Sequence, residues 1–352
     1  MVHFVLRILR KLNRQVLSSD KGQLLRALGL LVIIILICTF GFHWAESDRF
    51  LLENKKELAF FDCLWWTLTT ITTVGYGDFF PTTFYGRIFG YIAFFGTGLL
   101  AWALGETVSL VLSHRSRRLR GLLMLDFEKH VLICHFPGLE KIREVIGEIR
   151  ADRKFQKEPI VLVNNVLEEN PFPDDNIFFV KGSPNNKEIL LNAAVDKASR
   201  VIVLSQDETQ VESDFQSLGV VLIVEKNFPW VRTVVECVAK ENRHLFFDAG
   251  SDEVINLSSL AAGLLSQAMK EGGIPEVITY LVSNRSNNRI FSLIVQQEEI
   301  SVSGVMEKYF GKCHAIFLGF KSESRMQINP GDEEILKKGD IIFYIHDRRI
   351  AV

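Results

Sequence analysis

The sequence predicts a fold of two parts, an α-helical membrane part followed by a water-soluble α/β part. Two long, uncharged apolar runs lie within the first 120 residues, and a third apolar segment between them is too short to span a membrane. In the remaining sequence, short apolar runs alternate with amphipathic helical patterns, which is typical of a parallel sheet with crossover helices. A length of 352 residues agrees with about two domains.

The membrane part is expected to contain two spanning helices behind a basic N-terminal segment. Met1–Leu17 spaces apolar residues three and four apart with basic residues between them, which predicts an amphipathic helix on the membrane surface. Leu28–Trp44, with the leucines before it, can cross about 30 Å of hydrocarbon. Ile88–Leu104 is the second span, and its helix is expected to run from Phe84 to Leu112, longer than the membrane core requires.

Basic residues precede the first span and follow the second, whereas the loop between the spans mixes charges of both signs. The basic residues are Arg7, Arg10, Lys11, Arg14 and Lys21 before the first span, and Arg115, Arg117, Arg118 and Arg120 after the second. This asymmetry predicts a multi-pass protein of the cell membrane with both termini in the cytoplasm. Membrane lipid is therefore an expected partner, and no nucleic-acid partner is expected.

The short apolar segment Phe60–Ile71 would be only about 18 Å long as a helix. We expect it to enter the membrane and return, with the non-helical residues after it enclosed by protein or facing a water-filled cavity. Those residues read TTVGYGD, from Thr72 to Asp78. The central five are Thr73, Val74, Gly75, Tyr76 and Gly77.

This five-residue string has the chemistry of a potassium filter. A potassium ion loses its water shell in a narrow pore, and rings of backbone carbonyl oxygens, as in the known TVGYG loop, replace that water. Successive carbonyls on one side of a strand require alternating backbone handedness, which Gly75 and Gly77 permit without a Cβ clash. The Thr73 hydroxyl would add an oxygen at the cytoplasmic end. K⁺ is therefore the predicted permeant ion.

Leu64–Asp78, which reads LWWTLTTITTVGYGD, resembles the pore helix and filter of the two-transmembrane potassium channel family. The resemblance implies a homotetramer around the conduction axis. It also implies that Trp65, Tyr76 and Asp78 form a cuff behind the filter, with the Trp65 indole donating to the Asp78 carboxylate. Thr69 stands where some relatives have a glutamate.

Three glycines and one acid stand out in the second span. Gly96, Gly98 and Gly105 weaken the helix and permit bending, and the first two lie about where this family hinges its inner helix. Close packing of helices through small residues is an equally open interpretation. Glu106 either lines the inner mouth and attracts cations or is a solvated residue.

From residue 129 onward, strands and helices are expected to alternate as in a Rossmann-like unit. The predicted strands are His130–Cys134, Ile160–Val163, Ile177–Lys181, Arg200–Leu204 and Val231–Cys237. The predicted helices are Leu139–Arg150, Asn186–Val195, Gln210–Val224 and Leu257–Met269.

The order of pore, linker and Rossmann-like unit resembles channels that carry an RCK domain, a regulator of potassium conductance. Lys181–Pro184, Ala249–Ile255 and Gly339–Ile342 match local patterns of that domain, the last as its final strand. The expected segments are an amphipathic cytoplasmic helix (1–23), a pore domain (24–112), a linker (113–128) and a Rossmann-like lobe of the RCK domain (129–270). The resemblance further implies a smaller α+β C-terminal lobe (271–352).

The resemblance implies a channel gated by a ligand, which is either an adenine nucleotide such as NAD or a calcium ion. The GxGxxG fingerprint is absent, and asparagines stand where an acid would hold a ribose, so ordinary tight NAD binding is not expected. The crevice at the strand ends still offers a nucleotide site at Gly138, Asn164, Gly182, Ser183, Ser205 and Gln206. Calcium prefers carboxylate oxygens, and Asp207, Glu208 and Glu236 are its candidates. Val238 stands where a second acid on that strand would help.

Two other function classes remain to be separated from a channel. One is a membrane-anchored oxidoreductase that uses the Rossmann-like unit, but no catalytic constellation is visible beside the predicted sheet, so no enzyme is expected. The other is a sensor subunit that does not conduct. The five cysteines form no CxxC pair and are expected to be reduced, mostly buried thiols.

Overall fold

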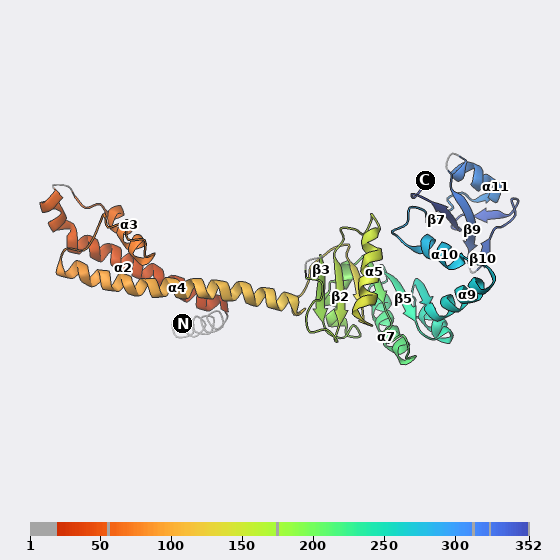
Figure 1. Ribbon diagram of the computed structural model, residues 1–352, viewed down its shortest axis with the longest axis horizontal. Coiled ribbons are helices and arrows are strands. Elements are labelled where there is room, and N and C mark those ends of the chain that lie inside the picture. The colour runs from red at the N-terminus through yellow and green to blue at the C-terminus, as the bar shows by residue number, and fades with distance from the viewer. Residues whose placement is uncertain (1–19, 55–56, 174–175, 312–313, 324, 351–352) are drawn as a thin grey trace, which may run out of the picture. The chain divides into compact units, whose positions relative to one another are not determined.

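The protein is described by a computed structural model that covers residues 20–54, 57–173, 176–311, 314–323 and 325–350. The amphipathic helix predicted over Met1–Leu17 lies outside these residues. The chain divides into two compact units, Met1–Arg117 and Arg118–Val352, which we call the membrane unit and the C-terminal unit (Figure 1).

The membrane unit consists of two long helices and one short helix. The long helices are α2 (Asp20–Asn54) and α4 (Phe84–Leu119), and both are long and apolar enough to cross a membrane. Between them, α3 covers Phe60–Ile71, the limits predicted for the re-entrant segment. The end of α4 lies seven residues beyond Leu112, the end expected from the sequence. Apolar periodicity stops near that residue, but the following serines and arginines do not break a helix.

Small residues bring α2 and α4 close together. A Cβ atom on Gly41 of α2 would lie 2.1 Å from the Phe89 ring of α4, so only glycine fits there. Phe42 stacks on Trp66 of α3 with ring centroids 3.9 Å apart. These contacts belong to an apolar core that all three helices share.

A buried glutamate joins α2 to the start of α4. Glu46, only 3% exposed, accepts hydrogen bonds from the Thr82 and Thr83 amides at 3.0 and 2.8 Å and from both hydroxyls. A Cβ on Gly86 would collide with this carboxylate. Sequence reasoning missed this role, because Glu46 is one of several charged residues between the two predicted spans.

The C-terminal unit begins with a six-stranded parallel sheet of order β3-β2-β1-β4-β5-β6, the order of a doubly wound fold. The strands are β1 Val131–Cys134, β2 Ile160–Asn164, β3 Ile177–Lys181, β4 Arg200–Val203, β5 Arg232–Cys237 and β6 Glu253–Asn256. The helices are α5 Leu139–Ala151, α6 Lys187–Asn192, α7 Glu212–Asn227, α8 Arg243–Asp248 and α9 Leu257–Lys270, with short 3₁₀ turns at Val195–Lys197 and Lys240–Asn242.

Both faces of this sheet are covered. Side chains of β1 contribute to two apolar clusters, Leu132 and Cys134 to one and Val131 and Ile133 to the other. Strands buried on both faces read as continuous apolar runs, which is why they were visible in the sequence. The predicted helix over Asn186–Val195 ends early, because Ala194 has a left-handed backbone.

A smaller antiparallel lobe follows. Its sheet has the order β10-β9-β12-β7, and β11 pairs with β8. The elements are α10 Ile274–Val282, β7 Arg289–Ile294, β8 Glu299–Ser301, α11 Val302–Val305, a π-helical turn at Met306–Phe310, β9 Ile316–Ser322, β10 Arg325–Ile328, β11 Ile335–Lys337 and β12 Ile341–His346. The last strand starts two residues after the predicted position, because Gly339 forms the turn before it with a φ of 95°.

Asp214, which is 1% exposed, holds the end of β5 against α7. Its carboxylate accepts the Val238 and Ala239 amides at 2.7 and 3.0 Å and the Asn242 side chain at 2.8 Å. We predict that Asp214→Ala destabilises the C-terminal unit by about 3 kcal/mol, because buried donors lose a charged acceptor.

Thermal unfolding of the purified chain measures this loss. The control is Asp248→Ala, which removes an exposed acid at the end of α8 and should leave the transition unchanged. Equal unfolding temperatures for Asp214→Ala and wild type would contradict the assignment.

Candidate functional site

The TVGYG string lies in the non-helical segment between α3 and α4. Its backbone alternates in handedness, with positive φ at Thr73 (61°), Gly75 (57°) and Gly77 (77°). This alternation is what allows successive carbonyls to face one side of a strand. Thr73 adopts the left-handed region without being glycine, a conformation that costs free energy and that surrounding bonds must stabilise.

The end of α3 supplies part of that stabilisation. The Thr69 carbonyl accepts the amides of Val74 at 2.9 Å and Gly75 at 3.2 Å, and the Thr70 carbonyl accepts the amide of Thr73 at 3.0 Å. The Thr69 hydroxyl is turned back to the Trp66 carbonyl at 3.1 Å. Thr69 therefore contacts the string through its backbone and not through its side chain.

Trp65 and Asp78 meet at the other end of the string. The Trp65 indole Nε1 donates to Asp78 Oδ2 at 2.8 Å, and its ring stacks on Tyr76 with centroids 5.5 Å apart and planes 3° apart. The second oxygen of Asp78 accepts the Phe79 amide at 3.1 Å. An aromatic stack on Tyr76 and a charge-assisted hydrogen bond to Asp78 thus hold the C-terminal end of the string, which we call the exit loop.

The glycines of α4 have different surroundings. A Cβ on Gly96 would lie 3.0 Å from Ile71 of α3 and 3.2 Å from Ile34 of α2, so this glycine serves close packing. Gly98 and Gly105 have open space around them. Glu106 accepts a hydrogen bond at 3.1 Å from the Trp102 indole one turn earlier.

In the C-terminal unit, the strand order reverses between β1 and β4, and ligands of such sheets bind at the carboxyl ends of the strands there. The loop after β1 is tied to the loop after β4. The Phe136 amide donates to Gln206 Oε1 at 3.2 Å, and Gln206 Nε2 donates to the Phe136 carbonyl at 3.0 Å. His135 precedes this pair with a φ of 71°, where the dinucleotide fingerprint would have small residues.

The remaining nucleotide candidates line the same edge. The buried Asn164 side chain accepts the Val166 and Leu167 amides, and its carbonyl accepts the Gly182 amide at 2.9 Å. The Ser183 hydroxyl accepts the Asn185 amide. Gly138 is the N-cap of α5. These residues lie along one edge of the sheet, but hydrogen bonds within their own loops engage most of their polar atoms.

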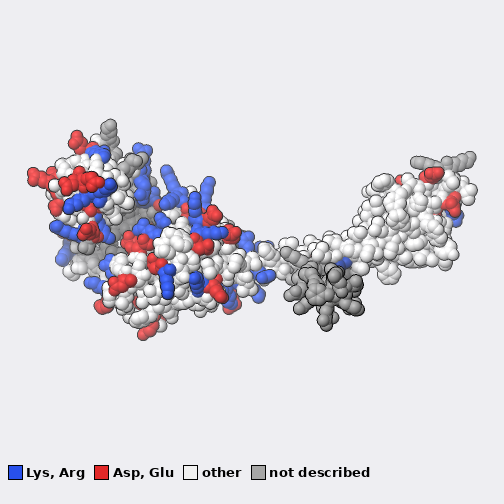
Figure 2. Space-filling model, turned by 180° about the vertical axis from the view of Figure 1, so that it is seen from behind, with Lys and Arg blue, Asp and Glu red and all other residues white. Residues whose placement is uncertain are grey.

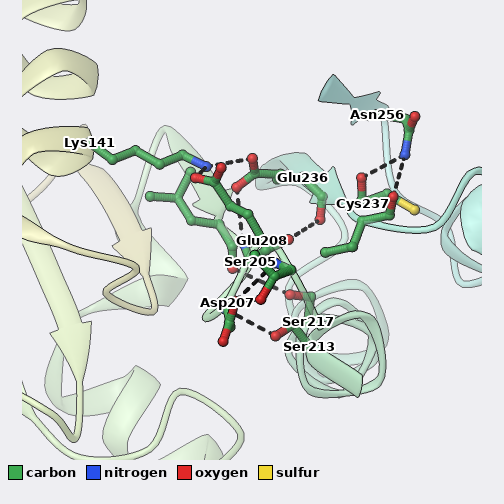
Figure 3. Close-up of polar contacts among 12 residues, drawn as sticks. Lys141, Ser205, Asp207, Glu208, Ser213, Ser217, Glu236, Cys237 and Asn256 are labelled. Atoms are coloured by element: carbon green, nitrogen blue, oxygen red, sulfur yellow. Dashed lines mark hydrogen bonds and ion pairs between the residues drawn. The ribbon is translucent and has the colours of Figure 1, made fainter. Parts of the chain in front are cut away.

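Two of the calcium candidates meet at a lysine that sequence reasoning missed (Figure 3). Lys141 of α5 forms ion pairs with both Glu208 and Glu236. Glu236 is 8% exposed, and its other oxygen accepts the Ser205 amide at 3.0 Å. The nearness of Lys141 to these acids could have been predicted, because Lys141 lies in the first turn of the helix after β1, at the edge of the sheet where β4 and β5 end.

Asp207 does not share this arrangement. Its carboxylate accepts the amide and hydroxyl of Thr209 at 2.9 and 2.6 Å, and these bonds hold the pKa of Asp207 below its usual value. Within the part of the chain that the structure describes, no three His, Cys, Asp or Glu side chains are placed to hold a metal ion.

Burial shifts the titration of several groups near the crevice. Desolvation lowers the pKa of His135 to about 4, so the imidazole is neutral near pH 7. It raises the pKa of Cys134 and of Cys237 to about 12, so both thiols stay protonated. The four described cysteines are all buried and free of disulfides.

Two family models match this chain in succession. Residues 29–113 match an ion channel family, and residues 126–235 match the RCK domain of calcium-activated, slowpoke-like potassium channels. The calcium-gated potassium channel TvoK of Thermoplasma volcanium is 27% identical over 82% of this chain and 81% of its own length. Potassium channel protein 1 of Methanocaldococcus jannaschii is 26% identical over 90% of this chain and 92% of its own length.

Among solved structures, the GsuK channel has the same fold. It aligns with a TM-score of 0.51 and 16% identity over 93% of this chain, which spans just over half (57%) of the GsuK chain. The two family matches follow each other in the predicted order, and both are to parts of ion channels, not of enzymes. The chain therefore joins an ion channel domain to an RCK domain, and it is a ligand-gated potassium channel.

Proposed function

We propose that four copies of this chain surround one pore and that residues Thr73–Gly77 of each copy form its filter. The backbone handedness that alternates at Thr73, Gly75 and Gly77 carries the proposal. With successive carbonyls on one side, four such strands present rings of oxygen atoms to a dehydrated K⁺. The Thr73 hydroxyl contributes the innermost oxygen, and both termini of the chain lie in the cytoplasm.

Gating passes from the RCK domain to the pore through α4. This helix is continuous from Phe84 to Leu119, and β1 begins only twelve residues later, at Val131. Gly98 and Gly105 have room around them and are the proposed hinge positions, whereas close packing against α2 and α3 restrains the helix at Gly96. Glu106 stands near the inner mouth, where its charge attracts cations.

The regulatory ligand acts at the crevice beside β1, β4 and β5. A nucleotide finds no glycine cradle after β1. However, Asn164 Nδ2 and His135 Nε2 are buried without a hydrogen-bond partner in the described residues, and a ligand with acceptor oxygens would satisfy the Asn164 amide donor. Calcium finds two carboxylates, but Lys141 already forms ion pairs with both and offsets one of their two charges. A calcium ion would have to displace this ammonium group.

Gly77→Ala tests the filter. A φ of 77° is strained for any residue with a Cβ, so we predict that potassium flux into liposomes is abolished while the tetramer still assembles. Gly29→Ala is the control, since Gly29 lies in α2 with open space around it. Wild-type flux in Gly77→Ala would refute the filter, and absence of flux in wild type would favour a non-conducting sensor.

Trp65→Phe tests the cuff. Phenylalanine keeps the stack on Tyr76 but loses the donor to Asp78, so the exit loop loses a charge-assisted bond of about 1.5–3 kcal/mol. We predict a K⁺ over Na⁺ permeability ratio reduced ~10-fold, measured from reversal potentials. Trp102→Phe removes a similar indole bond, to Glu106, and should keep the wild-type ratio. Equal ratios in all three proteins would contradict this role.

Lys141→Met tests the competition in the crevice. Without the ammonium group, Glu236 is a buried carboxylate without its counter-charge, so binding of a divalent cation becomes more favourable. We predict Ca²⁺ affinity at least ~10-fold above wild type by calorimetry, and a larger rise in unfolding temperature on adding Ca²⁺. Lys157→Met, at an exposed lysine away from the crevice, should behave as wild type. Equal affinities in all three would show that Lys141 does not exclude calcium.

A further inference from the structure

A groove of about 750 Å³ lies in the C-terminal unit between the Rossmann-like lobe and the smaller lobe. Its position differs from that of the crevice. Arg200 and Arg232, which line it, are the first residues of β4 and β5, whereas the crevice residues follow the carboxyl ends of the strands. The groove therefore belongs to the opposite edge of the parallel sheet.

Positive charge dominates this groove. Eight of its lining residues are basic and two are acidic. The basic residues are Arg153, Lys154, Arg200, Arg232, Arg285, Arg289, Arg348 and Arg349, and the acidic ones are Asp152 and Asp347. Lys and Arg side chains are frequent over the C-terminal unit in Figure 2 and scarce over the membrane unit.

Acidic neighbours compensate only part of this charge. Arg232, Arg285 and Arg289 form ion pairs with Glu253, Glu148 and Asp152 at 3.2, 3.3 and 3.5 Å. Arg153, Lys154, Arg200 and Arg349 form no ion pair within the described residues. Like charges gathered in one groove repel each other, so an anion that entered would relieve a cost of the folded state.

The walls of the groove are held together by specific bonds. Glu148 of α5 accepts the Asn284 amide at 2.7 Å and the Ser283 hydroxyl at 3.0 Å, both from the smaller lobe. The guanidinium groups of Arg289 and Arg349 lie over the Phe291 ring, 5.5 and 5.8 Å from its centroid. Their charged groups are therefore partly pre-organised before a ligand arrives.

We propose that this groove binds a small soluble molecule that carries several phosphate groups. Planar guanidinium groups bind phosphate oxygens in pairs, and arginine makes up seven of the eight basic residues. The volume is in the usual range of about 300–1,000 Å³ for small-molecule sites. Occupation of the groove joins the two lobes across one ligand. The site is separate from the crevice, and the proposal does not depend on conduction.

The test measures binding of tripolyphosphate and of ATP to the purified full chain by calorimetry. Arg153→Glu/Arg349→Glu reverses two exposed charges, one from each lobe, that pair with no acid among the residues that the structure describes. We expect ~10-fold or weaker affinity for both probes in this variant, and an intermediate loss in Arg153→Gln/Arg349→Gln. Lys226→Glu/Lys240→Glu changes the net charge equally at exposed positions outside the groove and should bind as wild type.

Each outcome bears on the proposal. Loss of tripolyphosphate affinity in the groove variant alone would support it, because this probe has no base for a nucleotide crevice to recognise. Equal affinity in the groove and control variants would overturn it, as would wild-type protein that binds neither probe. Binding only to vesicles containing a phosphorylated inositol lipid would also overturn it, since the ligand would then be a membrane surface.

Discussion

The hydrogen bonds between the end of α3 and the filter backbone are the constraint on which the membrane unit depends. A strand with left-handed residues at Thr73, Gly75 and Gly77 does not persist by itself, because Thr73 is strained there. The Thr69 carbonyl accepts two amides of the string and ends the helix at the same point. The main structural role of the short helix α3 is thus to hold the backbone of the next five residues in place.

Further contacts hold the residues that follow the filter string. Trp65 and Asp78 hold the exit side of the string, and Glu46 then fixes the following turn to α2 and starts α4. Each contact joins residues that are distant in sequence, and each uses a charged or aromatic group within an apolar unit. A buried carboxylate with four donors is stable there only because the turn supplies all of them.

The sequence predicted elements where periodicity or a run of apolar residues defines them. The limits of α3 and β3 agree with the structure, because each element coincides with one short run of mainly apolar residues. The end of α4 and the break at Ala194 were missed, since backbone conformation and polar helix formers decide them locally. The place of Lys141 at the sheet edge follows from its position in the helix after β1, but its choice of Glu208 and Glu236 as partners, like the cap by Glu46, depends on tertiary contacts.

The burial of the thiols has a practical consequence for studies of gating. Cys134 and Cys237 stay protonated and enclosed, and Cys38 and Cys63 are likewise buried, so burial shields all four from maleimide or methanethiosulfonate reagents in the folded chain. Spin labels or fluorophores attached to cysteines introduced at surface positions would report on those positions with little background from these four. Distances between labelled lobes could then be followed in a nearly native chain.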